Sequence, residues 1–300
     1  MSPLDALPMK ASDSCKKSRY YPVNLVQSLF TKGGNQMTKI KFKYTAPYCV
    51  LMTIVVVLNI GIVKGNAAEN QKGYMDPMAT KVLENVSDYL AKAKTLSMKA
   101  TAIDDHVMAS GVIVTYAKDV EVYVKRPDKF LAIIVDDNLK QRRIYFDGKS
   151  IVRLHVEKNT YQKFSYDGDI DGVLDHIIDN YDLDLPLADL IYNNIAGVMK
   201  ESIISAEHMG ERMVEGVPCH HLSFESTGAD WQVWVQKWDK PVLRRFAINF
   251  VNTDGNPQYL AMFKEWRINP GLDEQIFTFT PPFGAKEVEI KKSVGGKTVN

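Results

Sequence analysis

The sequence predicts a single α+β domain in which a large, curved antiparallel sheet packs against two helical segments. From Val120 onward, short stretches alternate apolar and polar residues and are separated by tight turns. Two stretches with helical spacing, one before these strands and one among them, present apolar stripes that need a sheet to cover them. Some strands are apolar on both faces, as at Leu260 and Met262 beside Ala261 and Phe263, which suits a sheet curled around a covered interior.

Residues 37–68 have the layout of a secretory signal peptide. Three lysines precede an apolar run, Ala46–Val63, and the small residues Gly65–Ala68 follow it. We predict cleavage near Ala67-Ala68, which places the rest of the chain outside the cytoplasm. The alternative is an uncleaved membrane anchor, because the run of 18 residues is close to the minimum that spans a bilayer.

The remaining chain divides into simple parts. Residues 1–36 lack apolar periodicity and are expected to be a disordered extension or the result of a start assigned too early. Residues 69–290 form the predicted domain, and residues 291–300 form a tail.

The charge and cysteine content of the part after Ala68 limit its function. That part carries 28 Lys and Arg against 34 Asp and Glu, a formal charge of −6, although the whole chain carries +1. Nucleic-acid binding needs a basic surface, so we expect no nucleic-acid partner. Cys219 is the one cysteine after Ala68, so this domain has no internal disulfide and must be held by its core.

The first predicted element of the domain is a helix that begins at Asp76-Pro77. Aspartate is a preferred N-cap residue, and proline is favoured in the first helical turn. The apolar stripe of this helix comprises Met78, Val82, Leu83, Val86, Leu90, Ala93 and Leu96.

Strands follow, and a second helical segment interrupts them. Asp147-Gly148-Lys149 is predicted to be a hairpin turn, because glycine accepts a positive φ. The second helical segment covers residues 172–181, and a short helix follows Asp184-Leu185-Pro186. The predicted strands are 120–125, 130–135, 143–146, 151–156, 161–164, 201–206, 217–224, 231–236, 242–251, 258–267 and 277–280.

The acidic run Asp167–Gly172 precedes the second helix. It matches the start of a calcium-binding loop, but the twelfth position is Ile178 where a glutamate is required. We therefore interpret the run as a helix start that places acids near the positive end of the helix dipole, with a weak calcium site as the alternative.

Several ordered motifs resemble known families over residues 76–290. The strand–turn–strand pattern of Val124–Phe130 and Tyr145–Ser150 resembles the opening of LolA-like proteins. The closer resemblance is to the predicted periplasmic family called domain of unknown function 2092. The matching segments are Leu185–Leu190, Gly216–Leu222, Asp230–Val235, Pro257–Tyr259 and Phe277–Pro282.

This resemblance implies an incomplete, strongly curved β-barrel of LolA-like type, with helices plugging its open side. It also implies a periplasmic location and a binding or carrier role, since the best-known LolA-like proteins carry lipid-modified cargo in an apolar cavity. We therefore expect a monomeric, non-enzymatic protein without cofactor or metal, whose partner is a lipid or lipid-modified cargo, with an envelope protein as a further partner. Residues expected to line the cavity or form its lid are Val82, Val86, Leu90, Leu174, Ile177, Leu187, Leu190, Trp231, Trp234 and Phe263.

Two other functions stay open at this stage. The first is an envelope scaffold whose core is filled and whose surface binds a partner protein. The second is a hydrolase or metal protein built on Cys219-His220-His221, in which Cys219 and His221 share one face of a strand. We expect no catalytic residue there, because a metal site usually needs three or four protein ligands and no second cluster is visible.

Overall fold

The computed structural model describes residues 73–289, except 182, 184, 194 and 196–202, together with the pairs 18–19, 293–294 and 297–298. The chain divides into two units, Met1–Thr31 with Gly73–Asn300, and Lys32–Lys72. No residue of the second unit is among those described, so the fold below is that of the first. The predicted signal peptide, almost all of the extension at residues 1–36, and most of the tail lie outside the described residues.

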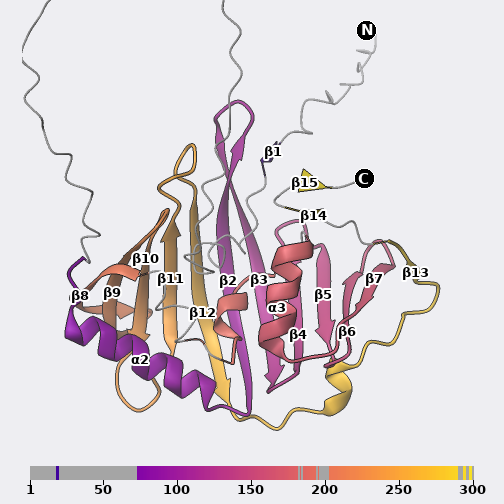
Figure 1. Cartoon of the computed structure of the whole chain (residues 1–300), viewed down its shortest axis with the longest axis horizontal. Coiled ribbons are helices and arrows are strands. Elements are labelled where there is room, and N and C mark those ends of the chain that lie inside the picture. Colours follow the sequence, from indigo (N-terminus) through magenta and orange to yellow (C-terminus); the bar gives the residue numbers. More distant parts are fainter. Residues whose placement is uncertain are drawn as a thin grey trace, which may run out of the picture. The chain divides into compact units, whose positions relative to one another are not determined.

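One antiparallel sheet dominates the described part of the chain (Figure 1). Twelve strands follow one another in the order β13-β7-β6-β5-β4-β3-β2-β12-β11-β10-β9-β8, and β1 pairs with β2 beside this path. The two terminal strands of the path, β13 and β8, do not pair with each other among the described residues, so the sheet is an open one. All neighbours are antiparallel except β13, which runs parallel to β7.

The sheet consists of two meanders joined at its centre. Strands β2 to β7 step outward in one direction, and β8 to β12 return so that β12 pairs with β2. The strand bounds are β1 Ser18–Arg19, β2 Thr95–Met108, β3 Ile113–Lys125, β4 Lys129–Asp136, β5 Gln141–Phe146, β6 Ser150–His155, β7 Thr160–Ser165, β8 Ile203–Val214, β9 Val217–Ser226, β10 Ala229–Gln236, β11 Leu243–Asn249, β12 Gln258–Ile268 and β13 Lys286–Glu287, with β14 Ser293–Val294 and β15 Lys297–Thr298 forming a separate pair.

Helix α2, Pro77–Ala91, begins where the sequence predicts. The Asp76 carboxylate accepts hydrogen bonds from the backbone N–H of Met78, at 2.7 Å, and of Ala79, at 3.3 Å. These bonds satisfy donors that the first helical turn leaves without intrahelical partners. The prediction of an N-cap at Asp76 is therefore confirmed.

The second helical segment also begins at an aspartate cap. Helix α3, Ile170–Asn180, starts after Asp169, whose side chain accepts from the Gly172 N–H at 2.9 Å. The acidic run that resembles a calcium loop is therefore a helix start. A short 3₁₀ helix, η2 at Ala188–Leu190, follows, and a second one, η3, occupies Glu274–Phe277.

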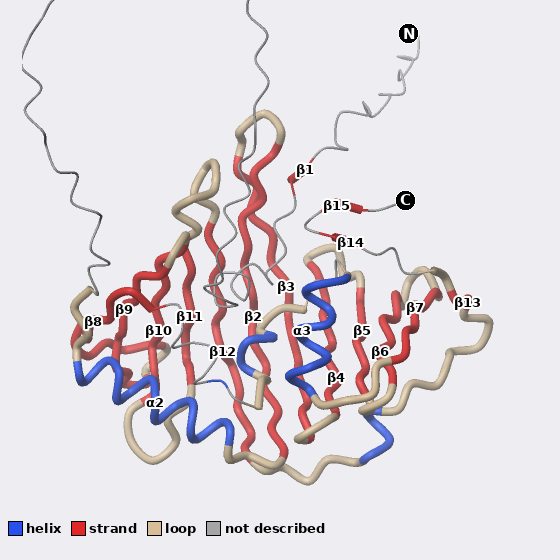
Figure 2. The backbone as a smooth tube through the Cα atoms, in the orientation of Figure 1, coloured by secondary structure: helices blue, strands red, loops and turns tan. Residues whose placement is uncertain are grey.

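Both helices pack on one face of the sheet, which we call the inner face (Figure 2). On β2 this face is formed by the alternate residues Leu96, Met98, Ala100 and Ala102, all at most 2% exposed. They join the apolar side chains of α2, α3 and η2 in a single buried cluster.

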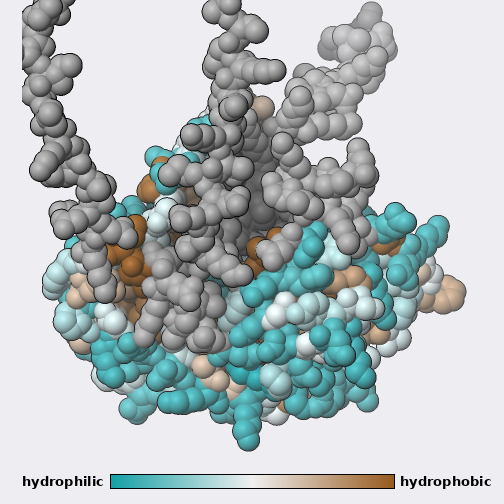
Figure 3. Space-filling model, in the orientation of Figure 1, coloured by the Kyte–Doolittle hydropathy of each residue, from teal (hydrophilic) through white to brown (hydrophobic). Residues whose placement is uncertain are grey.

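The opposite face, the outer face, is largely polar. On it, Lys99 Nζ pairs with Glu121 Oε1 at 2.9 Å, and Thr101 donates to Asp119. On the opposite side of the molecule, where the helices lie, hydrophilic residues predominate among the described residues seen in Figure 3. The α+β prediction of a curved sheet with helices on its open side is therefore confirmed.

Three element predictions were wrong. Strand β2 is absent from the prediction because its inner face carries the small residues Ala100 and Ala102, which weaken the apolar alternation. Leu96 was placed on the helix stripe, although α2 ends at Ala91 and Leu96 lies in β2. The strand predicted at 277–280 is wrong, since Phe277 closes η3 and no strand follows there.

Candidate ligand-binding site

Nine of the ten residues proposed to line a cavity or lid lie together in the buried cluster under the helices. Trp231 and Phe263 come from the inner face of β10 and β12 and are 2% and 1% exposed. The others come from the helical segments and are each at most 6% exposed, namely Val82, Val86, Leu90, Leu174, Ile177, Leu187 and Leu190. Protein side chains therefore fill the space between these nine residues.

The structure separates Trp234 from this group. Trp234 lies on the outer face, because it alternates with the buried Val233 and Val235 along β10. Its ring stacks on His221 at 4.3 Å between centroids, and the guanidinium of Arg245 lies 5.1 Å from the ring centroid. Trp234 thus belongs to a polar-aromatic surface cluster and does not face the interior.

Polar contacts hold the segment after α3, meaning η2 and the residues that follow it to Asn193, over the inner face. Arg126 Nη1 donates to Ile191 O and to Asn193 Oδ1, both at 2.8 Å. The Asn193 N–H donates to Asp171 Oδ1 at 2.5 Å, and Tyr192 donates to Asp175. Asn193 therefore links this segment to α3 and to the turn after β3.

A buried carboxyl group lies within the same segment. Asp189, in η2, is 7% exposed, and its Oδ1 has no hydrogen-bond partner among the described residues. Burial raises the pKa of this carboxyl to about 7. Burial also lowers the pKa of Arg126, whose guanidinium donates to Ile191 and Asn193 in this segment.

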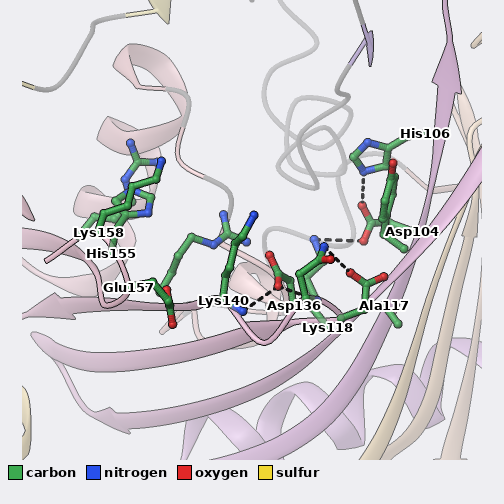
Figure 4. A pocket seen from close by; sticks show the side chains of 14 residues that line it. Asp104, His106, Ala117, Lys118, Asp136, Lys140, His155, Glu157 and Lys158 are labelled. Carbon is green, nitrogen blue, oxygen red and sulfur yellow. Dashed lines mark hydrogen bonds and ion pairs between the residues drawn. The ribbon is translucent and has the colours of Figure 1, made fainter. Parts of the chain in front are cut away.

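A polar cavity of about 670 Å³ lies on the inner face beyond the apolar cluster (Figure 4). Its charged residues occupy the inward-facing positions of neighbouring strands. The register places Lys118 opposite Asp136 and Arg142 opposite His155. The lining residues are Asp104, His106, Tyr116, Ala117, Lys118, Asp136, Asp137, Asn138, Lys140, Arg142, Arg153, His155, Glu157 and Lys158.

One end of this cavity contains a buried ionic cluster. Asp104 Oδ1 lies 3.1 Å from Lys118 Nζ, and Asp104 Oδ2 lies 2.7 Å from His106 Nε2. Asp104 and Lys118 are each 7% exposed. A buried pair such as this one needs its partners, because removing one leaves an uncompensated charge in the interior.

Two other acidic residues of the cavity hold its turns. Asp136 Oδ1 accepts from the backbone N–H of Asn138 and Lys140, at 3.0 and 2.9 Å. Glu157 Oε1 accepts from the Gln141 N–H at 2.8 Å.

The opposite end of the cavity carries more positive than negative charge, since Arg142, Arg153 and Lys158 lie there with one carboxylate, Glu157. Figure 4 shows His155 and Lys158 there, away from Asp104 and His106. Burial, together with the positive charges of Arg153, Lys158 and Arg142, lowers the pKa of His155 to about 4. His155 is therefore neutral at physiological pH, and the surrounding charge that disfavours its protonation is positive.

The Cys219-His220-His221 motif does not form a single cluster. Cys219 and His221 lie on the outer face, where His221 Nε2 is 2.8 Å from Gln232 Oε1. His220 faces the other way and lies 3.1 Å from His208. Cys219 is buried, and burial raises the pKa of its thiol, which disfavours the reactive thiolate.

The described residues contain neither a membrane-spanning helix nor a cluster of metal-binding side chains. Within the described ranges, no helix is long and apolar enough to cross a membrane. No group of three or more His, Cys, Asp or Glu residues in this part of the chain is arranged to hold a metal ion.

The sequence comparison decides the family. The model of the family described as "Predicted periplasmic protein (DUF2092)" matches residues 79–291. The chain belongs to this family. The match covers α2 from Ala79 onward, α3 and strands β2 to β13, so the DUF2092 region includes the apolar cluster and the polar cavity. No curated protein matches the chain.

Several solved structures are similar to this DUF2092 protein. An uncharacterized conserved protein from Thermus thermophilus has 14% identity and a TM-score of 0.39, with 71% of this chain and 99% of that chain covered. The lipoprotein LppX from Mycobacterium tuberculosis has 11% identity and a TM-score of 0.37, with 66% and 98% covered. A LolA superfamily protein from Nitrosomonas europaea has 10% identity and a TM-score of 0.35, with 67% and 97% covered. All three TM-scores lie below 0.5, so the function of this protein is inferred below from its own residues.

Proposed function

We propose that this protein binds the acyl chain of a lipid or lipid-modified protein and shelters it in the periplasm. One observation carries the proposal. The inner face of the sheet is apolar from β2 across to β10, and α2, α3 and the segment after α3 cover it. Outward movement of the segment after α3 would expose this face to an acyl chain.

The energetic basis is the transfer of hydrocarbon out of water. Each buried methylene contributes about 0.8 kcal/mol, so a chain of about ten methylenes supplies roughly 8 kcal/mol before the cost of moving the cover. The residues that would move or receive the chain are those of the buried cluster, including Leu174 and Ile177 on α3 and Leu187 and Leu190 after it.

Export to the periplasm is part of this proposal. The signal-like segment 37–68 with cleavage near Ala67-Ala68, and the family's description as periplasmic, support it. An acyl group needs shelter in such an aqueous compartment, because its exposure to water is unfavourable.

A second candidate function is a non-catalytic scaffold with a filled core. The close packing of the nine cluster residues favours it, since each is at most 6% exposed in this structure. Such a protein would act through its surface and bind a partner protein.

Native mass spectrometry tests the acyl-binding function directly. The domain at residues 69–300, purified from the periplasm, is expected to carry an extractable fatty-acyl or lipid species. After delipidation it is expected to bind a fluorescent fatty acid in a 1:1 complex that lauric acid displaces. A protein that is empty as purified and binds neither ligand would exclude acyl binding and favour the scaffold.

A further inference from the structure

The inner face is amphipathic along the strand direction. On β5 the inward-facing Ile144 lies two residues from the charged Arg142. On β6 the inward-facing Ile151 likewise lies two residues from the charged Arg153. Two residues along a strand span about 7 Å. The boundary between the apolar cluster and the polar cavity crosses the sheet obliquely, because the register places Arg142 opposite Ile134 and Arg153 opposite Ile144.

The cavity is not evenly charged. Its acidic groups bind parts of this protein, since Asp104 holds Lys118 and His106 while Asp136 and Glu157 hold backbone N–H groups. Apart from Lys118, the cationic groups concentrate toward the other end, where Arg153 Nε also donates to Gln162 Oε1 at 2.8 Å. Arg142 faces His155 across the β5–β6 pair, Arg153 lies two residues from His155 on the same face, and Lys158 follows in the turn.

The environment of His155 indicates the sign of the electrostatic potential at this end of the cavity. Burial comes first in lowering the pKa of His155, and Arg153, Lys158 and Arg142 lower it further. The positive charges that disfavour protonation of His155 would stabilise an anion at the same place. Guanidinium groups are also suited to phosphate, because they bind it with two parallel hydrogen bonds.

We propose that the cationic end of this cavity, formed by Arg142, Arg153 and Lys158, binds the anionic headgroup, of phosphate type, of an amphiphile whose acyl chain lies over the adjacent apolar face. This inference rests on the acyl-binding function proposed above and specifies the ligand class as anionic. Free phosphate carries the same charged group as such a headgroup. The test must therefore distinguish binding of the amphiphile from binding of the free anion.

Isothermal titration calorimetry with two amphiphiles of equal chain length and with inorganic phosphate provides the test. The delipidated domain is titrated with dodecyl phosphate, with the neutral dodecyl maltoside below its critical micelle concentration, and with inorganic phosphate. We expect dodecyl phosphate to bind about tenfold or more tightly than dodecyl maltoside, and the preference to shrink in high salt. Inorganic phosphate is expected to bind far more weakly than dodecyl phosphate.

Substitutions test whether the two arginines cause the preference for dodecyl phosphate over dodecyl maltoside. In R142Q/R153Q, the ratio of the two amphiphile affinities is expected to fall to about one, whereas R212Q, an exposed arginine of the edge strand β8 outside the cavity, is expected to keep it. Thermal unfolding checks that the variants fold. If R142Q/R153Q does not fold, K140Q/K158Q replaces it, because both lysines are exposed, and its expected loss of preference is about threefold.

Each remaining outcome overturns the inference. Equal affinity for both amphiphiles, or a preference that R142Q/R153Q retains, excludes the headgroup site while leaving acyl binding intact. Inorganic phosphate that binds as tightly as dodecyl phosphate assigns the site to a free anion. Binding of neither amphiphile excludes the acyl-binding function, and the headgroup site with it.

Discussion

At the scale of single residues, Asp189 is the group whose ionisation opposes the fold. Burial raises the pKa of its carboxyl from the usual 3.8 to about 7. Between pH 4 and 7 the folded protein therefore keeps a proton that the unfolded chain has lost. Stability falls as the pH rises through this window and stays level above it, with a total loss on the order of 4 kcal/mol.

The substitution D189N removes this titration. We expect the stability of the variant relative to wild type to rise between pH 4 and pH 8, as measured by urea unfolding at both values. D239N, at an exposed turn, serves as the control and should follow the wild-type pH dependence. The same pH dependence in D189N and wild type would show that Asp189 is ionised in the folded protein.

At the scale of the secondary-structure elements, the cap of α2 also ties this helix to the edge of the sheet. Besides its two bonds to the first helical turn, Asp76 accepts from the His208 N–H of β8 at 3.4 Å. D76A is expected to lose about 1 kcal/mol of unfolding free energy in urea titrations. The matched control is D88A on the exposed side of α2, where the pair with Lys92 is 4.0 Å long and worth less than about 0.5 kcal/mol. Equal losses in both variants would argue against a capping role.

The segment after α3 provides a second test at this scale. Asn193 accepts from Arg126 and donates its N–H to Asp171, so N193A removes the side-chain part of this anchor. If the segment is the moving cover, stopped-flow uptake of a fluorescent fatty acid should become about tenfold faster or more, since a lost bond to a charged group costs about 1.5–3 kcal/mol. N252A, in an exposed loop, should leave the rate unchanged. An unchanged rate in N193A would place the entry elsewhere.

The same elements show what the sequence alone could predict. Helix starts at Asp76 and Asp169 and the turn at Gly148, where φ is +86°, depend on local chemistry and were predictable. Strand β2 was not, because Ala100 and Ala102 pack well only against neighbours that are distant in sequence.

The site shows the same division. Nine apolar residues were predicted to lie together because their helical or strand spacing identifies a buried side. The polar cavity was missed, although a signal existed: Arg142 and Arg153 lie in phase with Ile144 and Ile151. Recognising it required knowledge of the register that aligns five strands, which local patterns do not supply.

At the scale of the whole molecule, the pairing of β2 with β12 joins the two meanders into one sheet over one core. Phe263 lies at this junction, opposite Ala100, and is 1% exposed. Because the cluster is continuous across both meanders, they should unfold together. We expect F263A to lose about 3–5 kcal/mol, since the cavity left beside a small alanine cannot readily close. F283A, whose ring is fully exposed, should change stability by less than about 0.5 kcal/mol. Calorimetry of F263A should still show one transition; two resolved transitions would mean that the meanders have separate cores, and an acyl chain spanning both would then lack a continuous surface.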